Sequence, residues 1–99
     1  LVSSSAASDV YKRQDVLFID TRRSDQFAEG HIPNAGHIEW REILSRRDEV
    51  PRDKPVVLYC NTGALSSKAQ FALRLAGREN VKVLLGGYDA WKRHQEALR

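Results

Sequence analysis

Short runs of mainly apolar residues recur along the chain and predict its strands. They run from Val16 to Asp20, from Val56 to Tyr59 and from Val81 to Leu85. Runs of this kind, rich in β-branched or aromatic residues, are typical of parallel strands that are buried on both faces. A weaker and shorter strand is predicted over 35–39.

The segments between these runs carry helical signals. The sequence predicts a short helix over 24–29, which Ser24 caps and Gly30 ends. Another short helix is predicted over 40–44, followed by a charged turn. A final helix presents four residues along one side: Tyr88, Trp91, Gln95 and Leu98.

The strongest helical pattern follows the run at 56–59. Ser67 and Gln70 have the spacing of a capping box, which predicts that the helix starts there. Gly77 is the predicted stop. Apolar residues recur between them with the helical period, namely Ala69, Ala72, Leu73 and Ala76. Strands that alternate with helices predict an α/β fold, with a parallel sheet of about four strands covered on both faces.

The first fourteen residues have no such periodicity. They are rich in Ser and Ala, and they lack the basic start and apolar centre of a signal peptide. The stretch 9–14 resembles the translation of an adapter used in transposase-based sequencing libraries. We therefore predict that residues 1–14 are a non-native or disordered tail and that the domain spans 15–99.

Composition narrows the classes of function. The 99 residues suffice for one domain, and the net charge of +3 comes from interspersed signs, which does not indicate a nucleic-acid or membrane partner. A single cysteine excludes an internal disulfide and a Cys-rich zinc site, and the three histidines lack metal-ligand spacing. No apolar stretch approaches the length of a transmembrane helix. A cytoplasmic location is the resulting expectation.

That one cysteine, Cys60, stands where a strand ends and a helix is about to begin. In open α/β sheets this edge carries the ligand site. A helix N-terminus favours the thiolate, Gly63 permits a tight loop, and Ser66 and Ser67 can add hydroxyl donors. The alternative is that Cys60 is a small buried apolar residue without chemistry.

Four motifs, in order, resemble those of the rhodanese-like sulfurtransferases. The segment from Cys60 to Ser66 is similar to their Cys-x-x-Gly-x-x-Ser active loop. Three further segments resemble the family's Asp-x-Arg, Gly-His-Ile-Pro-x-Ala and Gly-Gly-x-x-x-Trp motifs, and these are 20–22, 30–35 and 86–91. The resemblance covers the chain from Asp15 to about Lys92. It implies the three-layer α/β/α rhodanese-like fold.

The resemblance also implies a function. Cys60 would take a sulfane sulfur from a donor such as thiosulfate, become a persulfide, and pass the sulfur to cyanide, a thiol or an acceptor protein. No metal or organic cofactor is implied. The site residues implied around Cys60 are Arg22 and the loop residues Asn61, Thr62, Gly63, Ala64, Leu65 and Ser66. The loop amides would hold the anionic outer sulfur, while Arg22 would either brace the site through Asp20 or lend positive potential.

The chain departs from the family pattern in two places. Leu65 stands where many members carry Arg or Lys, so thiosulfate is less strongly indicated as the donor, and a relay or interaction module with little turnover is the alternative. Related phosphatases need an Arg at the position of Ser66 to hold phosphate, so phosphatase activity is not expected. The family's first strand also has no counterpart in residues 1–14. We therefore predict an N-terminally truncated domain with an unpaired edge beside 81–85 and reduced stability.

Overall fold

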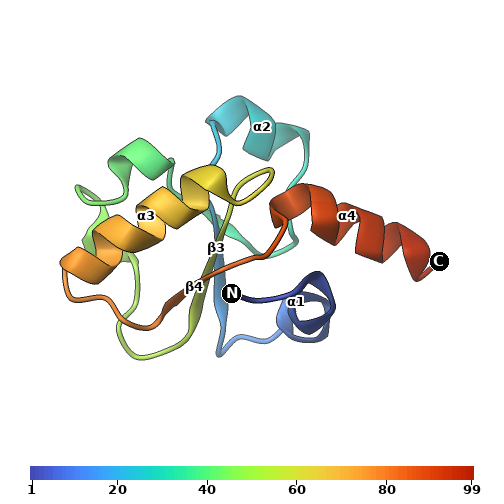
Figure 1. Ribbon diagram of the computed structural model, residues 1–99, viewed down its shortest axis with the longest axis horizontal. Coiled ribbons are helices and arrows are strands. Elements are labelled where there is room, and N and C mark those ends of the chain that lie inside the picture. The colour runs from blue at the N-terminus through green and yellow to red at the C-terminus, as the bar shows by residue number, and fades with distance from the viewer.

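A four-stranded parallel sheet forms the centre of the computed structural model, which describes residues 1–99 (Figure 1). The strands lie in the order β2-β1-β3-β4, and the neighbouring pairs are all parallel. Their bounds are Leu17–Asp20 (β1), Gly36–His37 (β2), Val56–Tyr59 (β3) and Val81–Val83 (β4). The predicted α/β fold with a parallel sheet of four strands is confirmed.

Helices cover both faces of the sheet. The α-helices are Ser4–Val10 (α1), Ser24–Glu29 (α2), Ala64–Leu75 (α3) and Gly87–Ala97 (α4), and two 3₁₀ turns are Trp40–Glu42 (η1) and Arg47–Glu49 (η2). Helix α3 lies on one face, whereas α1 and α4 lie together on the other (Figure 1). No helix among them has the length and apolar character that crossing a membrane requires.

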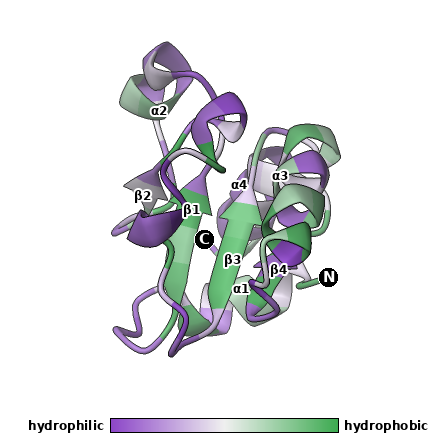
Figure 2. Ribbon diagram, turned by 90° about the vertical axis from the view of Figure 1, so that its left-hand side faces the viewer, coloured by the Kyte–Doolittle hydropathy of each residue, from purple (hydrophilic) through white to green (hydrophobic).

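Side-chain alternation along the strands divides the core into two apolar clusters. In β3, Val56 and Leu58 pack toward α3, while Val57 and Tyr59 pack toward α1 and α4. All four are buried, so the run is apolar on both faces as predicted. Figure 2 shows β1 and β3 as apolar strands between helices in which apolar and polar residues alternate.

The start of α3 differs from the sequence prediction. The helix begins at Ala64 after Gly63, so Ser67 lies within the first turn and the predicted capping box is wrong. Gly63 has a φ of 117°, and its carbonyl accepts the backbone N–H of Ser67 at 3.0 Å. Gln70 instead donates its side-chain amide to the carbonyl of Val81 at 2.9 Å. The glycine thus lets the helix begin one turn closer to the cysteine.

The first fourteen residues take part in the packing, in contrast to the tail predicted from their composition. Ala7 is fully buried, and Val10 and Tyr11 pack on the same cluster. The ring of Tyr11 meets that of Trp91 on α4 edge-on, with the centroids 5.6 Å apart. Ala7, Val10 and Tyr11 follow an i, i+3, i+4 spacing, but so short an apolar face is hard to recognise among the surrounding Ser and Ala residues.

The edge beside β4 is also partly occupied. The N–H of Val2 donates to the carbonyl of Val83 at 2.8 Å, and its carbonyl accepts the N–H of Leu85 at 2.6 Å. Val2 therefore forms an isolated parallel bridge with Leu84, and the predicted unpaired edge is wrong at that position. The chain forms a single bridge at this edge and no full strand. The non-native origin of 1–14 and the reduced stability stay predictions.

Candidate functional site

Cys60 follows directly on β3 at the carboxyl end of the sheet, where the chain turns into α3. Its side chain is 2% exposed. Two backbone bonds hold the loop from the far side: the N–H of Tyr88 donates to the carbonyl of Cys60 at 2.7 Å, and that of Asp89 to the carbonyl of Asn61 at 3.1 Å. The start of α4 is thereby locked against the cysteine. This contact explains why a glycine stands directly before Tyr88, since a Cβ on Gly87 would lie against the same carbonyls.

The loop curls around the sulfur. The N–H of Gly63 donates to Sγ of Cys60 at 3.1 Å, and Oγ of Ser66 lies 3.6 Å from Sγ. Burial raises the pKa of the Cys60 thiol, but hydrogen bonds from Ser66, Gly63 and Thr62 outweigh it and leave the pKa below its ordinary value. The loop therefore favours a thiolate, the form of cysteine that acts as a nucleophile.

We expect iodoacetamide to alkylate Cys60 readily at a lower pH than an ordinary thiol. Alkylation consumes the thiolate, whose fraction falls as the pH drops through the pKa, so a lowered pKa moves this fall to lower pH. Replacing Ser66 with alanine removes one stabilising hydroxyl and should move the midpoint of the rate profile upward. Ser67→Ala is the matched control, because Ser67 is exposed. Equal midpoints in both variants would contradict this account of the sulfur.

Arg22 and Asp20 form a buried ion pair beside the loop. Asp20 is 0% and Arg22 5% exposed, and Nη2 of Arg22 lies 2.7 Å from Oδ2 of Asp20. The same guanidinium donates to Oδ1 of Asn61 at 3.1 Å and to the carbonyl of Gly30 at 2.6 Å, and it lies over the ring of Tyr88. Arg22 thus ties the end of β1 to the cysteine loop.

The two histidines nearest this ion pair hold backbone groups. Nδ1 of His31 lies 2.8 Å from the carbonyl of Phe27, and Nε2 of His37 lies 2.6 Å from the carbonyl of Arg22. Both rings stack on that of Phe27. These contacts give His31 and His37 a structural role in holding the loops beside the ion pair. No group of three or more His, Cys, Asp or Glu side chains is placed to hold a metal ion.

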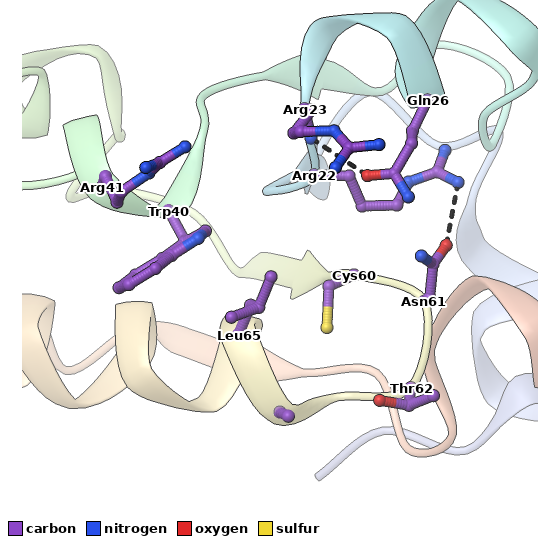
Figure 3. A pocket seen from close by; sticks show the side chains of 10 residues that line it. Arg22, Arg23, Gln26, Trp40, Arg41, Cys60, Asn61, Thr62 and Leu65 are labelled. Carbon is purple, nitrogen blue, oxygen red and sulfur yellow. Dashed lines mark hydrogen bonds between the residues drawn. The ribbon is translucent and has the colours of Figure 1, made fainter.

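A pocket of about 460 Å³ opens over the cysteine (Figure 3). Among the residues predicted for the site, it brings together Arg22, Cys60, Asn61, Thr62, Ala64 and Leu65. Gly63 and Ser66 are the predicted residues outside this lining, and both contact the sulfur from beneath. All the predicted site residues therefore surround Cys60 or its pocket.

The opposite wall of the pocket was missed by the sequence analysis. It consists of Arg23 and Gln26 from the start of α2 and of Trp40 and Arg41 from η1. Their place in the sequence, directly after two strands, could have identified them. They follow β1 and β2, whose carboxyl ends meet the same edge of the sheet as that of β3.

The chain is similar to known proteins both in sequence and in fold. The sequence profile described as "Rhodanese-like domain" matches residues 4–94, a span that begins within α1. A sulfurtransferase of Allochromatium vinosum is 38% identical over 92 residues, covering 93% of this chain and 86% of that protein. The thiosulfate sulfurtransferase GlpE of Coxiella burnetii is 31% identical over 93 residues, covering 94% of this chain and 87% of its own. A rhodanese-related protein from Thermoplasma volcanium shares the fold, with a TM-score of 0.85 at 22% identity and coverage of 94% and 90%.

Proposed function

The chain belongs to the rhodanese-like domain family, and we propose that it is a sulfurtransferase that carries a sulfane sulfur as a persulfide on Cys60. The observation that carries this proposal is the 3.1 Å hydrogen bond from the N–H of Gly63 to the sulfur, at the floor of an open pocket. A cysteine that served packing alone would not need an amide donor directed at its sulfur. The donor is a small sulfur-containing anion such as thiosulfate, and the acceptor is cyanide, a thiol or a protein.

The proposed reaction has two steps. The thiolate of Cys60 attacks the outer sulfur of thiosulfate, a new S–S bond forms, and sulfite leaves with the electron pair of the broken S–S bond. The acceptor then attacks the outer sulfur of the persulfide and releases the Cys60 thiolate. No general base is required, because both nucleophiles react as anions.

The residues around Cys60 receive distinct roles in this proposal. The loop from Asn61 to Ser66 directs backbone N–H groups at the anionic outer sulfur, which stabilises charge with donors that need not reorganise. Thr62, Ala64 and Leu65 contact the donor from the loop side of the pocket. Arg22 lines the pocket and holds Asn61 in place.

A sulfur relay or interaction module with little turnover is the second candidate. The observation that favours it is the uncharged loop, in which no side chain from Asn61 to Ser67 carries a charge. Such a loop holds a persulfide but attracts an anionic donor only weakly. This candidate shares the persulfide with the first and differs in the rate of its formation and discharge.

The test is the intact mass of the protein after incubation with thiosulfate or mercaptopyruvate and then with cyanide. We expect a gain of one sulfur atom that cyanide removes and that the Cys60→Ser variant does not show. Repeated turnover with thiocyanate release supports the enzyme, whereas a stable adduct that discharges only to a protein thiol supports the relay. Absence of any adduct from both donors would overturn the sulfurtransferase proposal.

A further inference from the structure

The outer side of α3 carries apolar side chains that the rest of the chain leaves uncovered. Phe71 and Leu75 are 66% and 75% exposed, and Leu44, which stands across from the helix, is 45% exposed. A hollow of about 280 Å³ lies between the helix and η1, and its lining consists of Trp40, Arg41, Ile43, Leu44, Lys68 and Ala72. Apolar side chains that gather on a surface in this way are typical of a contact with another protein.

This surface is continuous with the mouth of the pocket over Cys60. Helix α3 starts at the cysteine loop and runs away from it along the sheet (Figure 1). Leu65 lines the pocket, and Trp40 and Arg41 line both the pocket and the hollow. The side of the helix that Leu65 begins continues with the residues at the i+3, i+7 and i+10 positions, which are Lys68, Ala72 and Leu75. Together with Phe71, these four residues form the α3 face.

The α3 face has an excess of positive charge. Helix α3 contains two cations, Lys68 and Arg74, and no acidic residue. Both cations are exposed and neither forms an ion pair. The two acidic residues nearest Trp40 in sequence, Glu39 and Glu42, each pair with an arginine. A second copy of the chain would bring like charges together on this face, whereas a partner with carboxylates around an apolar patch would complement it.

The depth of the cysteine restricts how a protein can take its sulfur. Cys60 is 2% exposed and lies at the floor of the pocket, so an acceptor thiol must enter the pocket while the body of its protein stays outside. That body then rests on the surface beside the mouth. The α3 face, which begins at Leu65 on the rim, supplies exposed apolar area at this place.

We propose that the α3 face binds the protein that accepts the sulfur of Cys60, and that this partner carries a protruding thiol beside an apolar patch bordered by carboxylates. This inference rests on the proposed sulfurtransferase function and names the partner of its site. The partner's thiolate attacks the outer sulfur of the Cys60 persulfide anion, the S–S bond breaks, and Cys60 leaves as a thiolate with the electron pair. The partner is left with a persulfide anion, so two negative charges enter the reaction and two remain.

The test is the second-order rate constant of sulfur transfer from the Cys60 persulfide, followed by intact mass and expressed per acceptor thiolate. The acceptors are free cysteine and two synthetic peptides of equal length. Each peptide holds one cysteine among leucines, which glutamates surround in the first peptide and lysines in the second. The glutamate peptide should react about tenfold faster than the lysine peptide, and added salt should reduce the difference because it screens the charges.

Variants of the α3 face separate docking from chemistry. Lys68→Glu reverses a charge and Phe71→Ser removes an apolar contact, and each should lower the rate constant of the glutamate peptide about tenfold. The rate constant of free cysteine should not change, because cysteine is too small to reach the α3 face from the pocket. Arg93→Glu and Leu98→Ser are the matched controls, since both residues are exposed on or next to α4, over the other face of the sheet. These two variants should leave the glutamate peptide unaffected.

The outcomes distinguish this inference from the function on which it rests. Equal rate constants of the glutamate peptide in the Lys68, Phe71 and control variants, with persulfide still formed and discharged to cysteine, would overturn the docking surface and leave the sulfurtransferase function standing. A dimer of the parent protein in sedimentation equilibrium that Phe71→Ser abolishes would assign the α3 face to a second copy, and it would also overturn the inference. Absence of persulfide on Cys60 would overturn both.

Discussion

Replacing Asp20 with alanine is expected to lower the free energy of unfolding by about 3–5 kcal/mol, the cost of leaving a buried charge without its partner. Asp20 is fully buried and Arg22 nearly so, and the carboxylate accepts from both Nε and Nη2 of the guanidinium. It also accepts the backbone N–H of Arg22 at 2.8 Å. The substitution therefore strands a guanidinium and an amide in a site with little access to water.

The measurement is urea denaturation of the variant beside that of Asp25→Ala. Asp25 also pairs with an arginine two residues away, but this pair with Arg23 lies on the surface. Water solvates both partners there, so the unfolding midpoint of Asp25→Ala should stay close to that of the parent protein. A loss below about 1 kcal/mol for Asp20→Ala would contradict the role assigned to the buried pair.

Replacing Gly87 with alanine is expected to destabilise the fold by about 2–4 kcal/mol and to slow persulfide formation as well. A Cβ at this position would lie 2.5 Å from the carbonyl oxygen of Cys60 and 2.6 Å from the carbonyl group of Asn61. Gly87 also has a φ of 63°, which costs an L-residue about 1–2 kcal/mol. Backbone atoms must shift to relieve the contact, and those atoms belong to the cysteine loop.

Two other glycines separate the contributions to this effect. Gly77 has a φ of 88° but has no atom within 4 Å of an added Cβ, so Gly77→Ala should show the conformational cost alone, about 1 kcal/mol. Gly36 has neither a positive φ nor a close neighbour, and Gly36→Ala should be nearly neutral. Alkylation of Cys60 by iodoacetamide reports on the loop in each variant. If Gly87→Ala lowered the free energy of unfolding no more than Gly77→Ala, the close contact between the added Cβ and the cysteine loop would contribute nothing to the loss of stability.

The elements read correctly from the sequence are those whose signals are local. Val56 to Tyr59 form a strand that is buried on both faces, because a continuous apolar run places apolar side chains on both sides of the sheet. The errors arose where a remote contact decides the outcome. Gln70 reaches the carbonyl of Val81 in β4 and does not cap α3. Ala7 is buried because α1 packs with residues of α4 and of the sheet that are remote in sequence.

The outer face of α3 shows the same contrast between what local sequence predicts and what remote contacts decide. Phe71 and Leu75 lie on the helix that the sequence predicted, but they are 66% and 75% exposed. Helical spacing identifies which residues share a face, and it identified Ala69 and Leu73 as core residues. The number of apolar residues on a helix does not reveal how many of them the neighbouring elements cover.

By itself the sequence determined the parallel α/β architecture, the place of the one thiol at a strand end and the resemblance to the rhodanese-like family. Apolar runs and short motifs are properties of contiguous residues, so a single chain suffices to read them. Only the tertiary structure decided what the thiol faces. Arg23, Trp40 and Arg41 reach the pocket over Cys60 because the sheet order sets the end of β1 beside that of β3, with the end of β2 on the far side of β1. No local pattern encodes that order.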